Sequence, residues 1–308
     1  MSSRCYVPFN IVVASDIQYL EHLAVTLCSL FENNRNIAFD VYVLNTNVDV
    51  ASWNKLLELA KRYGQNLIDL KISDHDLEGL VTTYHLTLAT YYRLFIPEKV
   101  NLEKALYLDA DIVVNGSIED LYNTDVSESY LAGVVCPGFD RHEQLEMAKD
   151  AQYFNAGVMV INLKRWRQDR VKERVIEIAK RKPEAMVFSD QCGINAIVNG
   201  KWKQVHPKYN LQGAFVEQDI ASLAELFAPN DLIDAINHPV IIHYTGSAKP
   251  WQFHRKHPYR RLYWKYLRKT PYNHLLPKDL TIARIVRWCT QRMYRKPTGL
   301  ADSSSRRH

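Results

Sequence analysis

Two aspartates, Asp109 and Asp111, follow an apolar run of strand-forming residues in "ALYLDADIVV" (105–114). Side chains alternate between the two faces of an extended chain, so both carboxylates are expected to point to one spot. Two carboxylates offer the oxygen ligands that a hard divalent cation prefers, and such cations commonly complete their shell with substrate phosphates. The pair therefore predicts cleavage of a bond to a nucleoside diphosphate, because a bound cation would neutralise the departing diphosphate. Taken alone, such an acidic pair is more often solvated surface.

A second apolar run, "VIIHYTGSAKPW" (240–251), reaches His243 and continues through Gly246 and Lys249. An imidazole beside two carboxylates shifts the metal preference from Mg²⁺ towards Mn²⁺. Gly246 permits close approach of the backbone to a ligand, and Lys249 offers a positive charge for a phosphate. By itself, a single histidine is usually structural and a single lysine usually faces solvent.

Polar residues of two further segments complete the candidate site. Asn155 lies in "YFNAGVMVINLKRW" (153–166), and Asp190 and Gln191 lie in "FSDQCGIN" (188–195). Their amides and carboxylate would suit the hydroxyls of a sugar. Asn155 could equally mark a turn and Asp190 could cap a helix, and composition leaves both interpretations open.

Apolar runs with β-branched residues alternate with helix-like segments along the chain, which predicts an α/β domain with a largely parallel sheet. The runs are residues 10–15, 39–44, 66–72, 104–109, 130–136, 157–163 and 238–244, and the helix-like segments are 20–32, 51–63, 86–95 and 164–181. Ligands of such sheets bind at the carboxyl ends of the strands. Asp16, Asp109, Asp111 and His243 come at or just beyond the ends of runs, which indicates a single site.

Cysteine spacing, hydrophobic runs and glycine motifs indicate the compartment of the protein and exclude two common ways of binding a nucleotide. The five cysteines show no Cys-x-x-Cys spacing, and neither a membrane-spanning run nor a signal pattern is present, so a cytoplasmic protein is expected. Neither Gly-x-Gly-x-x-Gly nor a Walker-type loop occurs, so a bound nucleotide must be held in another way.

Charge is divided unevenly along the 308 residues. Residues 249–308 contain 16 Lys and Arg against 2 Asp and Glu, a net +14, which leaves −9 for residues 1–248 of a chain with net +5. Within this basic region, apolar residues of 281–296 recur at helical spacing and the arginines lie largely off that stripe. The pattern suits an anionic membrane surface, where each nearby cation contributes roughly 1 kcal/mol.

Two other interpretations of the basic region remain open. The stripe could pack on the domain, as is expected for 254–269, where aromatic and cationic residues alternate. Clustered cations and aromatics also suit nucleic acid, but the rest of the chain is acidic and shows no nucleic-acid module, so no such partner is expected.

Six segments, in order, resemble glycosyltransferase family 8, especially the bacterial lipopolysaccharide galactosyl- and glucosyltransferases. The segments are "SDIQYL" (15–20), "TYYRL" (90–94), "LYLDADIVV" (106–114), "YFNAGVMVINLKRW" (153–166), "SDQ" (189–191) and "HYTGSAKPW" (243–251). The resemblance covers roughly residues 8–270.

The resemblance implies a GT-A fold, with a Rossmann-like nucleotide-binding sheet in a catalytic domain of residues 1–250. It implies Mn²⁺-dependent transfer, with Mg²⁺ as a possible substitute, from UDP-galactose or UDP-glucose to an acceptor hydroxyl with retention of configuration. The acceptor would be a lipid-linked or oligosaccharide precursor of lipopolysaccharide or a related surface glycan. Residues 251–308 would then form a helical basic region with a disordered end, peripheral on the inner face of the bacterial cytoplasmic membrane.

The resemblance also assigns roles to single positions. The metal ligands would be Asp109, Asp111 and His243; the uridine pocket would contain Ala14, Asp16 and Tyr19; Arg93 and Ala110 would lie at the donor; the diphosphate contacts would be Gly246 and Lys249; and the donor-sugar contacts Asn155, Asp190 and Gln191. Lys249, Asp190 and Gln191 would act in catalysis, Gln191 near the reacting carbon. An amide is a poor nucleophile, so a front-face mechanism steered by the leaving diphosphate is expected rather than a covalent intermediate. Gln18 stands where the family frequently has Asn.

Two alternatives remain at this point. A transferase of the same family could use a protein glycan, a polyol or its own side chain as the acceptor. A non-catalytic protein that binds a nucleotide or nucleic acid would show binding without any transfer of sugar.

Overall fold

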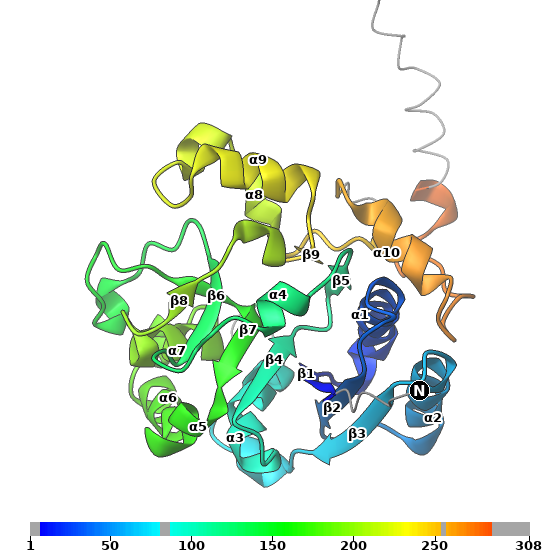
Figure 1. Ribbon diagram of the computed structural model, residues 1–308, viewed down its shortest axis with the longest axis horizontal. Helices are drawn as coiled ribbons and strands as arrows, with labels where there is room; N and C mark the ends of the chain where they lie inside the picture. The colour runs from blue at the N-terminus through cyan, green and yellow to red at the C-terminus, as the bar shows by residue number, and fades with distance from the viewer. Residues whose placement is uncertain (1–6, 81–86, 254–256, 285–308) are drawn as a thin grey trace, which may run out of the picture.

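The computed structural model describes residues 7–80, 87–253 and 257–284. The strands are β1 (Phe9–Ala14), β2 (Phe39–Asn45), β3 (Asn66–Lys71), β4 (Lys104–Leu108), β5 (Ile112–Val114), β6 (Leu131–Val135), β7 (Phe154–Asn162), β8 (Lys203–Gln204) and β9 (Ile241–His243). The helices are α1 (Leu20–Asn33), α2 (Val50–Arg62), α3 (Ile96–Lys99), α4 (Glu119–Tyr122), α5 (Leu163–Gln168), α6 (Val171–Arg181), α7 (Asp190–Val198), α8 (Gly213–Glu217), α9 (Pro229–Asn237) and α10 (Arg260–Leu267). Figure 1 shows their arrangement around a central sheet.

The central sheet has seven strands in the order β3-β2-β1-β4-β7-β6-β8. Only β7 runs against the others, because it pairs antiparallel with both β4 and β6. The prediction of an α/β fold with a largely parallel sheet is therefore confirmed.

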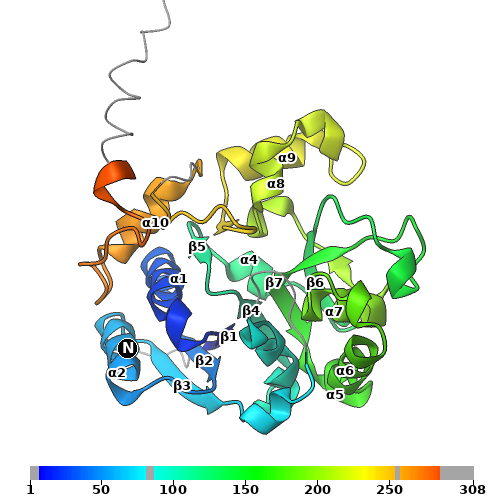
Figure 2. The ribbon, with the colours of Figure 1, turned by 180° about the vertical axis from the view of Figure 1, so that it is seen from behind.

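Helices cover both faces of this sheet (Figures 1 and 2). Along β1, Ile11 and Val13 pack in a core with α1, α2 and α10, whereas Val12 and Ala14 pack in a second core with α3, α5, α6 and α7. Strands buried on both faces are expected to be continuously apolar, which explains the uninterrupted runs that the sequence shows.

The predicted helices differ from the observed ones in two places. Residues 164–181 do not form one helix, because Arg170 has a left-handed conformation with φ of 51° and separates α5 from α6. The segment expected at 86–95 is the 3₁₀ helix η3 (Leu88–Phe95) rather than an α-helix. The predicted helices at 20–32 and 51–63 correspond to α1 and α2.

The seventh apolar run, 238–244, belongs to a separate small sheet. Its strand β9 pairs antiparallel with β5, and His243 stands opposite Ile112. This run therefore lies outside the central sheet, because the turn after β4 gives it a separate partner strand. That turn, at Ala110 and Asp111, carries the chain out of the central sheet and into β5.

The described part of the C-terminal region packs on α1. In α10 the hydroxyl of Tyr263 lies 2.7 Å from Nδ1 of His22, and Asn33 donates a hydrogen bond of 2.8 Å to the hydroxyl of Tyr266. The predicted docking of the aromatic and cationic segment is thus confirmed from residue 257 onward. The predicted amphipathic stripe at 281–296 lies mostly outside the described residues. Within the ranges described, no helix is both long and apolar enough to cross a membrane.

Candidate functional site

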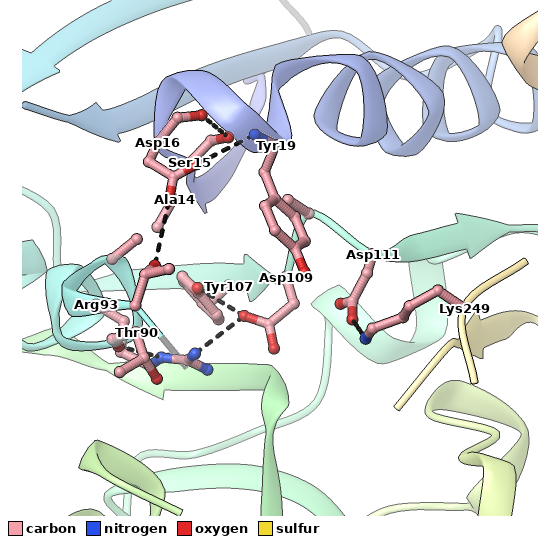
Figure 3. A pocket seen from close by; sticks show the side chains of 13 residues that line it. Ala14, Ser15, Asp16, Tyr19, Thr90, Arg93, Tyr107, Asp109, Asp111 and Lys249 are labelled. Carbon is pink, nitrogen blue, oxygen red and sulfur yellow. Dashed lines mark hydrogen bonds and ion pairs between the residues drawn. The ribbon is translucent and has the colours of Figure 1, made fainter. Parts of the chain in front are cut away.

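Two adjoining cavities of about 130 Å³ and 300 Å³ lie beyond the carboxyl ends of β1 and β4. Five residues line both and form the wall between them: Thr90, Arg93, Asp109, Asp111 and Lys249. Figure 3 shows these five residues together with others that line the smaller cavity.

The structure brings all of the predicted site residues to these two cavities. Ala14, Asp16, Tyr19 and Ala110 line the smaller cavity; Asn155, Asp190, Gln191, His243 and Gly246 line the larger one; and Arg93, Asp109, Asp111 and Lys249 line both. Residues from opposite ends of the chain thus meet at one edge of the sheet.

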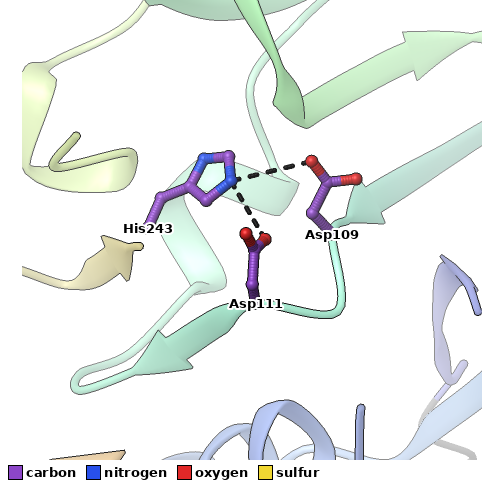
Figure 4. Close-up of side chains that lie close together, drawn as sticks. All are labelled: Asp109, Asp111 and His243. Carbon is purple, nitrogen blue, oxygen red and sulfur yellow. Dashed lines mark ion pairs between the residues drawn. The ribbon is translucent and has the colours of Figure 1, made fainter. Parts of the chain in front are cut away.

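Asp109, Asp111 and His243 form a cluster whose ligand atoms all lie within 4.8 Å of one another (Figure 4). Nε2 of His243 is 3.6 Å from Oδ2 of Asp109 and 3.2 Å from Oδ1 of Asp111. The carboxylates do not converge through strand alternation, as the sequence suggested, because a turn lies between them. Instead, the antiparallel register of β5 and β9 places the last residue of β9 beside the start of β5.

The donor set of this cluster fits a divalent cation. Nδ1 of His243 lies 3.0 Å from Oδ1 of Asn210, so the imidazole can donate through Nδ1 and keep the Nε2 lone pair directed at the carboxylates. Two carboxylate oxygens and one imidazole nitrogen are ligands that Mn²⁺ accepts readily. Among the described residues, no other group of three or more His, Cys, Asp or Glu has this proximity.

Lys249 and Asp111, two residues of this wall, form an ion pair. Nζ of Lys249 lies 2.5 Å from Oδ2 of Asp111 and donates a hydrogen bond of 2.7 Å to the backbone oxygen of Tyr244. Burial alone would raise the pKa of Asp111, but the Lys249 ammonium outweighs burial and holds this pKa far below its usual range. Asp111 is therefore ionised.

Arg93 joins the cluster to the larger cavity. Its guanidinium contacts Asp109 at 3.1 Å and Asp190 at 2.8 Å, and it donates to the backbone oxygen of Ala156 at 2.5 Å. Burial would lower the pKa of Arg93, but the two carboxylates outweigh burial and raise it. Asp190 also accepts a hydrogen bond from Thr90. Because Asp190 is fully buried, desolvation raises its pKa to about 6 despite the neighbouring Arg93.

Asp16 shapes the entrance of the smaller cavity. Its Oδ1 accepts hydrogen bonds from the backbone N–H groups of Gln18 and Tyr19, at 3.0 and 3.1 Å, and so caps the short helix that precedes α1. Oδ2 accepts from the hydroxyl of Thr87 at 3.2 Å. Burial, followed by the charge of Asp111, raises the pKa of Tyr19 to about 12, so its hydroxyl stays protonated.

Three residues of the site were missed by sequence reasoning. Asn210 lies in 207–230, a stretch that carries no motif, and Thr90 is part of "TYYRL" but has no charge that would mark it. Gly157 lies so close to the cluster that a Cβ there would be 2.1 Å from Cε1 of His243 and 2.6 Å from Oδ2 of Asp109. The Asn-Ala-Gly sequence was a signal for this close approach, but it is equally typical of a turn.

Comparison with known sequences agrees with the family resemblance of the six segments. The sequence model described as "Glycosyl transferase family 8" matches residues 10–255. General stress protein A of Bacillus subtilis is 28% identical over 261 residues, which cover 82% of this chain and 91% of that protein. Lipopolysaccharide 1,2-glucosyltransferase of Escherichia coli is 26% identical, with 81% and 74% covered. Glycosyltransferase GlyD of Streptococcus pneumoniae is 32% identical over 83% of this chain, which spans only 30% of that longer protein.

Comparison with solved structures shows the same fold. The galactosyltransferase LgtC, solved with donor and acceptor sugar analogues, superposes with a TM-score of 0.77 at 24% identity, covering 88% of this chain and 98% of LgtC. This similarity shows the GT-A fold, and the family match extends over most of the described chain. The chain therefore belongs to glycosyltransferase family 8.

Proposed function

We propose that this glycosyltransferase transfers galactose or glucose from its UDP form to a hydroxyl of a lipopolysaccharide or related surface glycan, with retention of configuration. The observation that carries the proposal is the pair of cavities with a charged wall between them. A nucleotide sugar has a nucleoside, a diphosphate and a sugar in a row, and the two cavities with their wall match that order. The lipopolysaccharide glucosyltransferase among the relatives supports the acceptor class.

A divalent cation, with Mn²⁺ favoured over Mg²⁺, would be held by Asp109, Asp111 and His243 and would supply positive charge to the leaving diphosphate. The uridine would occupy the smaller cavity beside Ala14, Asp16 and Tyr19. Lys249 would exchange its ion pair with Asp111 for the diphosphate, because a phosphate oxygen is a comparable partner for its ammonium. Gly246, with φ of 73° and no atoms near its Cβ position, would let the backbone approach that diphosphate.

The sugar would occupy the larger cavity, where Asp190, Asn155 and Gln191 face it. The amide oxygen of Gln191 already accepts hydrogen bonds from the backbone N–H of Ala156 at 2.9 Å and from Asn155 at 3.3 Å. An oxygen engaged in this way is a weak nucleophile, which supports a front-face reaction. In that reaction the bond from the acceptor oxygen to the anomeric carbon forms as the bond to the diphosphate breaks. The acceptor proton passes to the departing phosphate oxygen, and Lys249 stabilises the charge that develops there.

The outer part of the larger cavity has a partly apolar wall that suits an acceptor glycan. Phe188 is 46% exposed and lines this cavity with Val187 and Pro137. Apolar side chains at the mouth of a polar cavity can pack against the C–H face of a sugar ring. We place the acceptor here, on the side opposite the nucleotide.

The basic C-terminal region would hold the enzyme at the inner face of the cytoplasmic membrane, where lipid-linked acceptors are found. Beyond α10, Leu276 and Ile282 are 69% and 81% exposed in a segment that also contains Lys278 and Arg284, which pair with Glu21 and Asp279 and would exchange these partners for lipid phosphates. Exposed apolar side chains among cations are typical of a surface that binds anionic lipid.

The test is Mn²⁺-dependent release of UDP from a panel of UDP-sugars by the wild type and the Asp111→Asn variant. Asp111→Asn keeps the size of the side chain but removes one charge, and is expected to lower turnover by about 100-fold or more, since metal ions contribute several kcal/mol. Asp120→Asn, at an exposed position in α4, serves as the matched control. If no UDP-sugar is consumed and UDP does not bind with Mn²⁺, the proposal is wrong.

A further inference from the structure

Two buried asparagines, Asn210 and Asn155, connect His243 of the acid and histidine cluster to Gln191 through hydrogen bonds. The chain runs from His243 to Asn210 at 3.0 Å, from Asn210 to Asn155 at 3.0 Å, and from Asn155 to Gln191 at 3.3 Å. Asn210 is fully buried, and Asn155 is 8% exposed. The proposed function assigns no role to Asn210.

The direction of these hydrogen bonds is fixed by two backbone N–H groups of β7. Gly157 N–H donates to Oδ1 of Asn155 at 3.0 Å, and a backbone N–H can only donate. That end of Asn155 must therefore be the oxygen, and the atom of Asn210 that contacts it must be the NH₂ donor. The other end of Asn210 is then its carbonyl oxygen, which faces Nδ1 of His243 and requires a hydrogen there.

The same argument holds at Gln191, the other end of this series of hydrogen bonds. Ala156 N–H donates to Oε1 of Gln191 at 2.9 Å, so this end of Gln191 must be the oxygen. It also receives the NH₂ group of Asn155, in agreement with the orientation that Gly157 imposes on Asn155. Nε2 of Gln191 then donates to the hydroxyl of Tyr153 at 3.3 Å. Two independent backbone donors thus give one consistent orientation.

These backbone donors are available because the pairing of β6 and β7 is interrupted. Val134 stands opposite Asn155 and Ala132 opposite Val160, with a shift of register between them. Ala156 and Gly157 lie within this interruption, where their N–H groups turn to side-chain oxygens.

We infer that Asn210 is a positioning residue. It holds His243 in the tautomer with hydrogen on Nδ1, which leaves Nε2 free as a metal ligand, and it couples this ligand through Asn155 to the amide orientation of Gln191. The inference about Gln191 rests on the proposed function, whereas the tautomer of His243 is a property of the free protein.

The tautomer can be observed directly. Long-range ¹⁵N–¹H NMR spectra of the metal-free protein in alkaline buffer, assigned with a His243→Gln variant, show which ring nitrogen carries hydrogen. The wild type is expected to carry it on Nδ1, and Asn210→Ala is expected to show a mixture of tautomers. A wild-type ring protonated on Nε2, or no change in Asn210→Ala, would overturn the inference.

Two substitutions of Asn210 distinguish its contact with His243 from its contact with Asn155. Asn210→Ala removes both hydrogen bonds and is expected to weaken Mn²⁺ binding, measured by EPR of free Mn²⁺, about 10- to 100-fold and to lower kcat for the hexose donor. Asn210→Asp keeps an acceptor for His243 but turns a second acceptor towards Asn155, so Mn²⁺ binding is expected to persist while kcat falls. Equal Mn²⁺ affinities for the two variants would contradict the inference.

Asn34→Ala provides the matched control. Asn34 is equally buried at the far end of α1, donates to the backbone oxygens of Leu30 and Gly116, and accepts from the N–H of Ile118. Its loss should destabilise the fold without changing Mn²⁺ affinity or the His243 spectrum. If no sugar transfer is found for any variant, the proposed function fails, while the NMR and Mn²⁺ measurements still decide the role of Asn210.

Discussion

Gly157 and Asp190 illustrate two different demands that the site makes on single residues. Gly157 must be small, because His243 and Asp109 both occupy the space where its side chain would lie. The charge state of Asp190 is set by two opposing effects. Burial away from water favours the neutral carboxyl, whereas the ion pair with Arg93 favours the carboxylate. The first demand is steric and the second is electrostatic, so they are tested in different ways.

Gly157→Ala is expected to lower turnover and weaken Mn²⁺ binding, each by about 100-fold, because a displacement near 1 Å at a reacting site has effects of this size. The new Cβ would lie 2.1 Å from His243, so the imidazole or β7 must move. The control is Gly133→Ala in the neighbouring strand β6, where the nearest atom to the new Cβ is 3.6 Å away. Equal activity of the two variants would show that the cluster tolerates movement of His243.

The raised pKa of Asp190, about 6, predicts a pH dependence of stability. Between about pH 4 and 6 the native carboxyl keeps its proton while the unfolded one loses it, so the free energy of unfolding falls as pH rises, by about 3 kcal/mol in total. Denaturant unfolding of the wild type and Asp190→Asn at a series of pH values isolates this contribution. The difference between the free energies of unfolding of the two proteins is expected to change by about 3 kcal/mol between pH 4 and 6 and to be constant above pH 7. A difference independent of pH would contradict the assignment.

The elements that build the site could be predicted from sequence to very different degrees. The apolar runs predicted β1, β2, β3, β4, β6 and β7 of the central sheet. The signal is most continuous in β1, β4, β6 and β7, because these strands are buried on both faces. The sheet of β5 and β9 could not be predicted in this way, since each of its strands has only three residues and its pairing joins segments over a hundred residues apart. The predicted site residues nevertheless lie close together in the structure. They stand at the ends of strands and helices, and the pairing of β5 with β9 brings these ends side by side.

Helix α10 supports the smaller cavity indirectly, through His22 and Trp251. Tyr263 bonds to His22, whose ring stacks at 3.6 Å on Trp251, and Trp251 lies beside both Tyr19 and Lys249. Burial lowers the pKa of His22 to about 3, so its ring is neutral in this stack. The position of Lys249 therefore depends on a helix that contributes no residue to either cavity.

Tyr263→Phe is expected to destabilise the protein by about 1–3 kcal/mol, because it leaves a buried ring nitrogen of His22 without its partner. Urea unfolding measures this difference. Tyr272→Phe is the matched control, since the Tyr272 hydroxyl is buried but has no hydrogen-bond partner among the described residues. Comparable losses in both variants would mean that the His22 contact contributes nothing beyond packing.

At the scale of the whole molecule, the dominant feature is the separation of a basic C-terminal region from an acidic body. Residues 249–308 carry a net +14 and residues 1–248 a net −9. An anionic membrane would attract the first part and repel the second, and so favour one orientation of the enzyme on its surface.

Removal of residues 285–308 tests this attraction while it leaves every contact within the described chain intact. The deletion removes six Lys and Arg and one Asp. At about 1 kcal/mol per cation, co-sedimentation with anionic vesicles should weaken more than 10-fold. Release of UDP from the donor should remain close to that of the full chain. Full-length protein with neutral vesicles is the control, and unchanged binding by the shortened protein would exclude membrane attraction as the role of this segment.

The two cavities draw their walls from different parts of the gene. Apart from Lys249, the smaller cavity is lined by residues between 14 and 111, whereas the larger one, apart from the shared wall, is lined by residues between 136 and 246. Under the proposed function, mutations in the codons for residues 136–246 would alter the choice of sugar or acceptor and leave the nucleotide-binding residues as inherited. The proposed function thus predicts that replacing this gene segment with that of a relative would transfer the relative's choice of sugar or acceptor.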